Sequence, residues 1–179
     1  MKNNFPTIQT NRLLLRQFTN DDLENVFKGL SHPDVIKHYG VSYSTLEETK
    51  QQMKFFVVLE TNKTGTWWAI CSADNKIFYG GCGLNNINIQ HKKGEIGYWL
   101  LPEFWGKGII AKAATLICEY GFTHFDLHRI EAVVETGNDN SKKIMEKLGF
   151  EYEGTMKECE IKNGRYLSLH MYALLNRKQ

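Results

Sequence analysis

Residues 102–111, PEFWGKGIIA, constrain the fold more than any other segment of this chain. Gly106 and Gly108 stand between an apolar run typical of a strand and a run with helical periodicity. The first N–H groups of a helix lack partners within the helix, and the helix dipole places partial positive charge there. Because glycine has no Cβ, the backbone at such a point can approach phosphate oxygens closely. The segment predicts a phosphate-binding strand–loop–helix unit, or alternatively a tight turn that needs glycine only for its dihedral angles.

Strand and helix signals alternate along the rest of the chain. Short runs rich in β-branched and aromatic residues predict strands at 12–18, 66–73, 77–89, 94–101 and 129–135, and on both sides of Asn163-Gly164, a strong hairpin signal. Helices are expected to begin near Thr19 and Ser44, to cover 109–122, and to follow a cap at Asn138 or Asn140. Pro33 is expected to end the first helix. We predict an α/β fold with a central, mostly antiparallel mixed sheet of about seven strands, flanked by helices.

Size and charge narrow the functional classes. The 179 residues suit one domain, which we expect to span 1–179. Lys and Arg number 22 and Asp and Glu 20, and the resulting net charge of +2 is too small to indicate a nucleic-acid-binding protein. No apolar run approaches the ~20 residues of a membrane span, and residues 1–11 lack the apolar core of a secretory signal. We therefore expect a cytoplasmic protein without a nucleic-acid or membrane partner; a homodimer is possible on these grounds.

Cysteine and histidine spacing argues against a metal site. Four cysteines are present, at Cys71, Cys82, Cys118 and Cys159, and no two form a CxxC pair. The six histidines show neither HxH nor HExxH spacing. We expect four buried thiols and no bound metal.

Two known phosphate-binding patterns can be compared with the glycine segment. The P-loop pattern GxxxxGK[ST] is absent. Gly106-x-Gly108-x-x-Ala111 matches the Rossmann pattern locally, but four residues separate the strand from the first glycine and a meander of strands precedes it. A dinucleotide-dependent oxidoreductase is therefore kept only as a third alternative.

Four segments follow one another in a specific order: residues 95–100 (EIGYWL), residues 102–108 (PEFWGKG), the pair Asn138-x-x-Ser141, and residues 146–150 (EKLGF). Together they closely resemble the GNAT superfamily of N-acetyltransferases, in particular its RimJ/RimL-type branch. Residues 10–18 (TNRLLLRQF), Asp21-Asp22 and Glu153-Gly154 also resemble that branch, so that the resemblance covers nearly the whole chain. It implies an acetyl-CoA-dependent enzyme that acetylates a primary amine, on a protein N-terminus or a small molecule, by direct attack on the thioester.

The resemblance also implies where acetyl-CoA binds. The pantetheine arm would lie along Tyr98, Trp99 and Leu100, and the pyrophosphate along Gly106, Lys107, Gly108, Ile109, Ile110 and Ala111. Asn138 would cap its helix and contact the pantetheine. The chain departs from the family pattern Q/R-x-x-G-x-G/A at Trp105, a residue familiar in this branch, and at Ile110. The bulk of Ile110 is expected to change how the backbone approaches the last phosphate.

Acetyl transfer needs a neutral amine, a donor for the oxyanion and a proton for the departing thiolate. A backbone N–H near Trp99 is the natural oxyanion donor. Similar RimL-type enzymes place a serine at the position of Ser141, where it protonates the thiolate, and a glutamate at the position of Glu160, which acts as base through a water. The alternatives are that Ser141 is an ordinary helix N-terminal residue and that Glu160 lies on a solvated edge strand.

The hairpin register supports the choice of Glu160. Pairing across Asn163-Gly164 places Glu160 opposite Leu167 and Glu158 opposite Leu169, and apolar surroundings would raise the pKa of a carboxylate. Glu158 and Glu95 are further candidates for the base, although a structural salt bridge is the alternative for Glu95. The branch often has an aspartate at the position of Ser168, a departure that predicts altered acceptor recognition.

Two further functions remain open beside the acetyltransferase. A non-catalytic acyl-CoA sensor could use the same fold, and the oxidoreductase described above could use the glycine loop alone. Stabilisation by CoA but not NAD would exclude the oxidoreductase, and release of free thiol with an amine would exclude the sensor.

Overall fold

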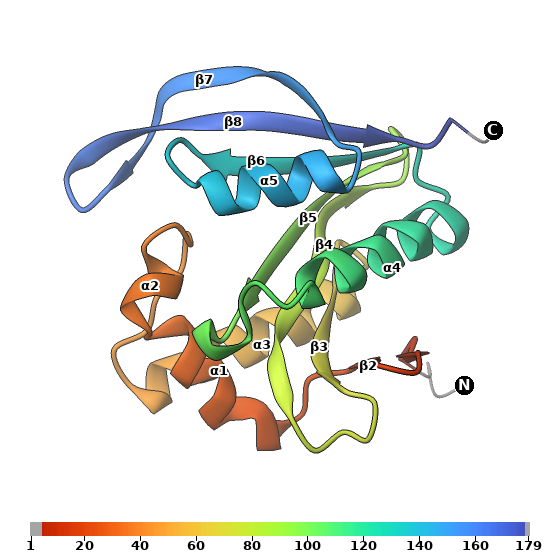
Figure 1. Ribbon diagram of the computed structural model, residues 1–179, viewed down its shortest axis with the longest axis vertical. Helices are drawn as coiled ribbons and strands as arrows, with labels where there is room; N and C mark the ends of the chain where they lie inside the picture. The colour runs from red at the N-terminus through yellow and green to blue at the C-terminus, as the bar shows by residue number, and fades with distance from the viewer. Residues whose placement is uncertain (1–4, 178–179) are drawn as a thin grey trace.

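The computed structural model describes residues 5–177, and its centre is one eight-stranded mixed sheet (Figure 1). The strand order is β1-β2-β3-β4-β5-β6-β8-β7. The strands are β1 (Ile8–Gln9), β2 (Leu13–Arg16), β3 (Thr66–Ser72), β4 (Phe78–Asn88), β5 (Lys93–Leu100), β6 (Arg129–Glu135), β7 (Glu151–Lys162) and β8 (Arg165–Leu175). β5 and β6 pair in parallel, and the other neighbouring strands are antiparallel. The predicted α/β class and mostly antiparallel sheet are confirmed, with the two-residue β1 as an additional strand.

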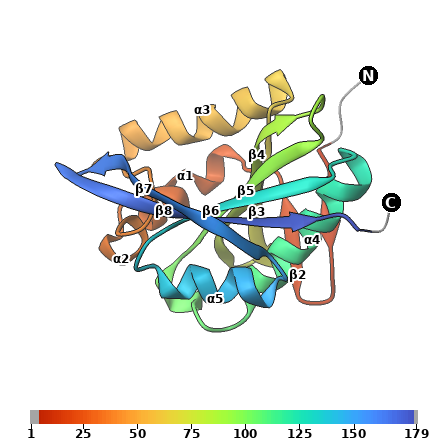
Figure 2. The same ribbon diagram turned by 90° about the horizontal axis from the view of Figure 1, so that it is seen from above.

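Helices cover both faces of the sheet. The α-helices are α1 (Leu23–Leu30), α2 (Pro33–Ile36), α3 (Leu46–Asn62), α4 (Ile109–His124) and α5 (Asp139–Lys147), and short 3₁₀ turns occupy Asn20–Asp22 and Pro102–Phe104. α1 and α3 lie on one face, and α4 and α5 on the other (Figure 2). Among the described helices, none is long and apolar enough to cross a membrane.

The predicted helix starts follow from side-chain capping. Thr19 and Asp22 form a capping box ahead of α1, in which the Thr19 N–H donates to the Asp22 carboxylate at 2.8 Å. The Thr45 hydroxyl accepts the Glu48 N–H at the start of α3. The expectation for Pro33 is wrong, because α1 ends at Leu30 and Pro33 instead begins α2. Proline suits the first position of a helix, where its missing N–H would have no partner.

Two hydrophobic cores lie on the two faces. The larger core packs α4 and α5 against the sheet and centres on Trp68, Ile117 and Ile130, which are fully buried. The smaller core packs α1 and α3 against the sheet around Phe56 and Trp99. The two cores hold β5 between them, so that alternate residues of this strand point toward different helical layers.

The last hairpin contains an irregularity that the sequence does not show. Asn163 and Gly164 have φ values of +50° and +74°, as a two-residue turn requires. Glu160 pairs with Leu167 as predicted, but a bulge between Met156 and Glu160 shifts the rest of the strand. Met156, not Glu158, therefore lies opposite Leu169, and the predicted partner of Glu158 is wrong.

The cysteine prediction holds for three of four positions. Cys71, Cys82 and Cys118 are buried, and burial raises the pKa of each thiol. Cys159 is exposed, because it lies on the outer strand β7 beside the bulge. Within residues 5–177, His, Cys, Asp and Glu side chains form no group of three that could hold a metal ion.

Candidate active site

The gap between β5 and β6 is the main opening in the sheet. These strands pair at Lys93–Arg129, Gly94–Ile130 and Glu95–Glu131, and within the described chain no pairing continues beyond Glu95. Figure 1 shows the two strands side by side at one end and well apart at the other. From Ile96 to Trp99 the backbone therefore lacks a strand partner on this side, which leaves it open to an extended ligand.

The glycine loop stands at the open end of β5. Gly106 and Gly108 have φ values of +72° and +73°, which favour glycine, and Gly108 is the N-cap of α4. A Cβ built on either residue would meet no atom within 4 Å, so both positions border open space. The first-turn N–H groups of α4 lie directly behind these glycines, and the loop fits the phosphate cradle that the sequence predicts.

Two side chains of the loop region behave differently from the sequence expectation. Ile110 is only 6% exposed and packs in the core beneath α4, so its bulk points away from the cradle. Trp105 donates its indole N–H to the Leu100 carbonyl at 3.0 Å. Trp105 therefore closes the loop onto the end of β5, a structural role that no sequence pattern predicts. Lys107 lies with its ammonium 5.3 Å from the centre of the Phe104 ring.

The Ser141 hydroxyl at the start of α5 lies near the Tyr98 hydroxyl on β5. Asn138 caps this helix by accepting the Ser141 N–H at 3.2 Å, as predicted. Ser141 lies beside the Tyr98 hydroxyl, which is buried and has no well-aligned hydrogen-bond partner among the described residues. Burial raises the pKa of Tyr98 to about 12, while the Ser141 hydroxyl acts in the opposite direction. No pattern in the sequence singles out the Tyr98 hydroxyl, because its position beside Ser141 depends on contacts between residues distant in the chain.

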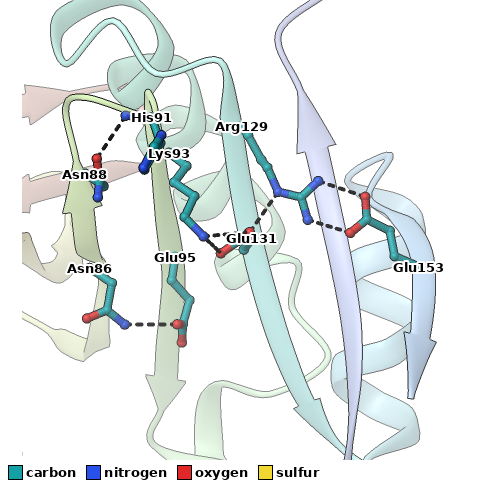
Figure 3. Close-up of polar contacts among 8 residues, drawn as sticks. All are labelled: Asn86, Asn88, His91, Lys93, Glu95, Arg129, Glu131 and Glu153. Atoms are coloured by element: carbon teal, nitrogen blue, oxygen red, sulfur yellow. Dashed lines mark hydrogen bonds and ion pairs between the residues drawn. The ribbon is translucent and has the colours of Figure 1, made fainter. Parts of the chain in front are cut away.

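Glu95 lies on the opposite face of β5, where the pairing with β6 ends (Figure 3). Burial raises the pKa of this half-buried carboxylate, and the nearby charges of Glu131 and Glu160 raise it further. A hydrogen bond from the Asn86 amide, 3.1 Å from Glu95 Oε2, and the charge of Lys93 lower it. The balance leaves the pKa of Glu95 above its ordinary value, as suits a general base.

Glu160 does not have the surroundings that the hairpin register predicted. It faces Leu167 but is exposed, so the expected burial among apolar side chains is wrong. β7 is the outer strand of the sheet, and most of its side chains are exposed. Glu160 still lies close enough to Glu95 for its charge to act on that carboxylate.

An ion-pair ladder holds the closed end of the gap (Figure 3). Lys93 lies 3.3 Å from Glu131, and Arg129 Nε lies 2.8 Å from the same carboxylate. Arg129 also bonds Glu153 through both terminal nitrogens. Burial would raise the pKa of Glu131, but the bonds from Arg129 and Lys93 outweigh it and lower the pKa. The ladder joins β5, β6 and β7 just before the strands separate.

A second set of contacts ties the hairpin to the segment after α2. The Lys162 ammonium lies 3.2 Å from Glu135 Oε2 and donates to the Lys37 carbonyl. His38 Nδ1 lies 3.3 Å from the other oxygen of Glu135. These contacts join parts of the chain that are distant in sequence, and no local pattern predicts them. By the alternation of side chains along β6, Glu135 lies on the same face of the sheet as Glu131, the partner of Glu95.

The geometry defines a class of protein, one that binds an extended thioester with a phosphate-bearing end. The thioester would lie in the gap between β5 and β6, with its phosphates at the glycine loop. A family model described as "Acetyltransferase (GNAT) domain" matches residues 12–151. An uncharacterized N-acetyltransferase of Bacillus subtilis, YoaA, is 32% identical over 176 residues, which cover 98% of this chain and 99% of the relative. The chain belongs to the GNAT acetyltransferase family. It is an acetyl-CoA-dependent N-acetyltransferase, and the predicted family, donor and enzyme class are confirmed.

Solved structures share the fold across different named activities. RimL, a ribosomal L7/L12 α-N-protein acetyltransferase in complex with coenzyme A, has a TM-score of 0.83 at 24% identity, covering 95% of this chain and 98% of its own. A spermidine N-acetyltransferase from Vibrio cholerae, in complex with CoA and spermine, has a TM-score of 0.81 at 23% identity, covering 93% and 96%. The names of these two proteins refer to a protein N-terminus and to a polyamine. The shared fold therefore does not by itself determine the acceptor.

Proposed function

We propose that this chain transfers the acetyl group of acetyl-CoA directly to a primary amine and that Glu95 is the general base. The observation that carries the proposal is the position of Glu95. It is a half-buried carboxylate with a raised pKa, at the point where the pairing between β5 and β6 ends. A base must be ionised to accept a proton and basic enough to hold it, so a raised carboxylate pKa improves transfer near neutral pH. Glu160, the base predicted from the sequence, is exposed and becomes a neighbouring charge in this proposal.

The strand geometry makes the proton transfer indirect. An N–H near Trp99 is the proposed oxyanion donor, four residues after Glu95. At a rise of about 3.3 Å per residue the two positions are about 13 Å apart along the strand. The proton would therefore travel from the amine to Glu95 through water, as general-base catalysis permits.

The departing thiolate would take its proton on the other face of β5. Ser141 is the proposed donor, and the Tyr98 hydroxyl beside it is the second candidate. A phenol with a pKa of about 12 stays protonated at neutral pH and can donate to sulfur. The proposed base and the proposed acid therefore lie on opposite faces of β5. The base serves the amine, and the acid serves the thiolate that leaves the donor.

The donor site rests mainly on backbone groups. We propose that the pantetheine lies along Tyr98, Trp99 and Leu100 and that the pyrophosphate lies on residues 106–111. Asn138 uses its amide oxygen to cap α5, which leaves its amide nitrogen for the pantetheine. Trp99 contributes backbone alone, because its side chain is 3% exposed within the smaller core.

The acceptor would enter on the Glu95 side, between the hairpin and the segment after α2. An α-amine has a pKa of about 7.7–8.0 and a lysine amine about 10.4. At 1.36 kcal/mol per unit, deprotonation at pH 7 costs about 1 kcal/mol for the first and about 4.6 kcal/mol for the second. We propose a protein N-terminus or another amine of low pKa as the acceptor. Cytoplasmic location and a homodimer stay predictions from the sequence.

Thiol release from acetyl-CoA tests the function. The protein is incubated with acetyl-CoA and a panel of small amines and N-terminal peptides, and the Glu95→Gln variant serves as the control. We expect release that depends on the amine and falls sharply in the variant. A peptide with a blocked N-terminus and a free lysine should react more slowly than its converse. CoA binding without thiol release for any amine would favour the non-catalytic sensor.

A further inference from the structure

β4 contains an irregularity directly beside Glu95. Asn85 pairs with Glu95 and Asn88 pairs with Lys93, so two residues of β4, Asn86 and Ile87, lie opposite Gly94 alone. Asn86 has a φ of +50°, in the left-handed region that few residues other than glycine adopt. Such bulges disrupt a ladder locally and can redirect a side chain.

The bulge changes the face on which Asn86 lies. Side chains alternate along a regular strand, so Asn85 would share a face with its partner Glu95 and Asn86 would point to the other face. Instead, the Asn86 amide donates to Glu95 Oε2 at 3.1 Å (Figure 3). Asn85 meanwhile accepts the Trp67 indole N–H at 2.6 Å, which anchors the strand at the foot of the bulge.

We propose that Asn86 is a positioning residue, which the bulge places so that its amide orients the Glu95 carboxylate and favours its ionised form. The inference rests on the proposal that Glu95 is the base. The amide oxygen and nitrogen of asparagine differ in what they can do here, because only the nitrogen can donate to an ionised carboxylate. An aspartate has nearly the same shape and also tolerates the left-handed conformation, but it would place a second carboxylate against the first.

The other charges around Glu95 explain why the hydrogen bond from Asn86 matters for the ionisation of Glu95. Glu131 on β6 and Glu160 on β7 disfavour the ionised form, whereas Lys93 on the same strand favours it. Lys93 is itself bonded to Glu131, in the ladder with Arg129. Asn86 is thus the neutral donor that offsets repulsion by two carboxylates and the effect of burial. Its contact lets Glu95 remain ionised at lower pH than its surroundings alone would allow.

A simpler explanation is that Asn86 is present only because asparagine tolerates a bulge. Two substitutions separate the explanations. Asn86→Gly keeps the left-handed backbone and removes the amide, and Asn86→Asp keeps shape and backbone preference but replaces the donor with a charge. Asn88→Gly is the matched control, because Asn88 lies on the same strand end but accepts the His91 N–H and does not contact Glu95.

The test measures the Glu95 carboxyl directly and the reaction separately. Carboxyl carbons of labelled glutamate are titrated by NMR in the full-length protein, with Glu95→Gln to assign the signal. We expect the Glu95 titration to move to higher pH in Asn86→Gly, to move further in Asn86→Asp, and to stay in place in Asn88→Gly. The acidic limb of the kcat/KM profile should move in the same order, with little change on the high-pH plateau.

The results that would overturn the role of Asn86 differ from the result that would overturn Glu95 as the base. An unchanged Glu95 titration in both Asn86 variants would remove the positioning role, whatever the kinetics show. A displaced titration with an unmoved pH–rate profile would instead show that Glu95 is not the base, so the proposed mechanism would fail while the contact stands. A lower Tm alone, equal in Asn86→Gly and Asn88→Gly with no titration change, would assign Asn86 to the bulge only.

Discussion

The proposed donor side and the proposed acceptor side of the β5–β6 gap are built from different parts of the chain. On the donor side, the geometry comes from the backbone: the unpaired edge of β5, two left-handed glycines and the first turn of α4. On the acceptor side it comes from side chains, with Glu95 and Glu160 near the gap and the Lys162–Glu135 contact on the same face of the sheet.

This difference explains how one fold can serve unlike amines. A backbone cradle persists through most side-chain substitutions, because it needs only the right dihedral angles. A surface made of carboxylates and ion pairs changes with every substitution in it. Two solved structures of the same fold have names that refer to a protein N-terminus and to spermidine. Substitutions on the donor side are therefore expected to weaken CoA binding, and substitutions on the acceptor side to change the reaction with the amine.

The largest effect is expected on the donor side, from Gly108→Val. Valine at a φ of +73° is strained by at least ~1–2 kcal/mol, and relief of that strain would turn the cradle N–H groups away. We expect no measurable CoA binding by isothermal titration. A CoA concentration of 100 times the wild-type Kd, which stabilises a binding protein by about 2.7 kcal/mol, should leave the melting temperature of the variant unchanged.

Gly164→Val supplies the control for strain. Gly164 has a φ of +74°, and a Cβ built there also meets no atom within 4 Å, but it lies in the hairpin turn. It should lose a similar amount of stability and keep its CoA affinity. Unchanged CoA affinity in a folded Gly108→Val protein would show that the phosphate cradle is elsewhere.

The next effect, on the acceptor side, is expected from Glu95→Gln. Loss of a general base lowers kcat by ~10²–10⁴-fold, and the loss should shrink as the pH rises, because more of the amine is then neutral. CoA affinity should stay the same, since Glu95 lies outside the cradle. Steady-state kinetics from pH 6 to 9 check this result. A normal rate at pH 7 would return the role of base to Glu160.

A smaller effect is expected from Lys162→Met, which breaks the contact with Glu135 and leaves the hairpin free of the segment after α2. A partly exposed ion pair contributes up to about 1 kcal/mol, equivalent to roughly a fivefold change. We expect the KM for the amine to rise by roughly two- to fivefold, with CoA affinity unchanged. A lower Tm with the amine KM intact would mean that the contact stabilises the fold without shaping the site.

The smallest effect is expected from Glu160→Gln, as a movement of the pH profile. The negative charge of Glu160 disfavours ionisation of Glu95 and so raises the pKa of Glu95. Its removal should lower that pKa, and the acidic limb of kcat/KM should move to lower pH with the plateau nearly unchanged. A large fall in kcat instead would identify Glu160 as the base.

Local patterns were enough to predict most of the donor side. The strand before Pro102, the glycine pair and the helix after it have sequence periods that the structure confirms. The Asn138 cap and the Asn163-Gly164 turn were also predicted, because both depend on residues within a few positions of one another. Such features are decided by propensity and capping, which a single sequence contains.

The acceptor side was predicted less well for a physical reason. A bulge adds one residue to a strand and reverses the alternation after it, while the composition of the strand stays the same. The bulge in β4 turns Asn86 toward Glu95 in this way. Glu160 pairs with Leu167 as predicted but is exposed, because β7 is the outer strand of the sheet and most of its side chains are exposed. Cys159 is exposed on the same outer strand.

The short β5–β6 pairing has a mechanical consequence. Three residue pairs join the half-sheet β1–β5 to the half-sheet β6–β8, and the ion-pair ladder holds the two halves together at that end. A donor lying along β5 would brace the two halves against each other. Those backbone amides of residues 96–100 that face the gap should then exchange with solvent more slowly once the donor is bound. The first substrate would thereby become a structural part of the site that receives the second.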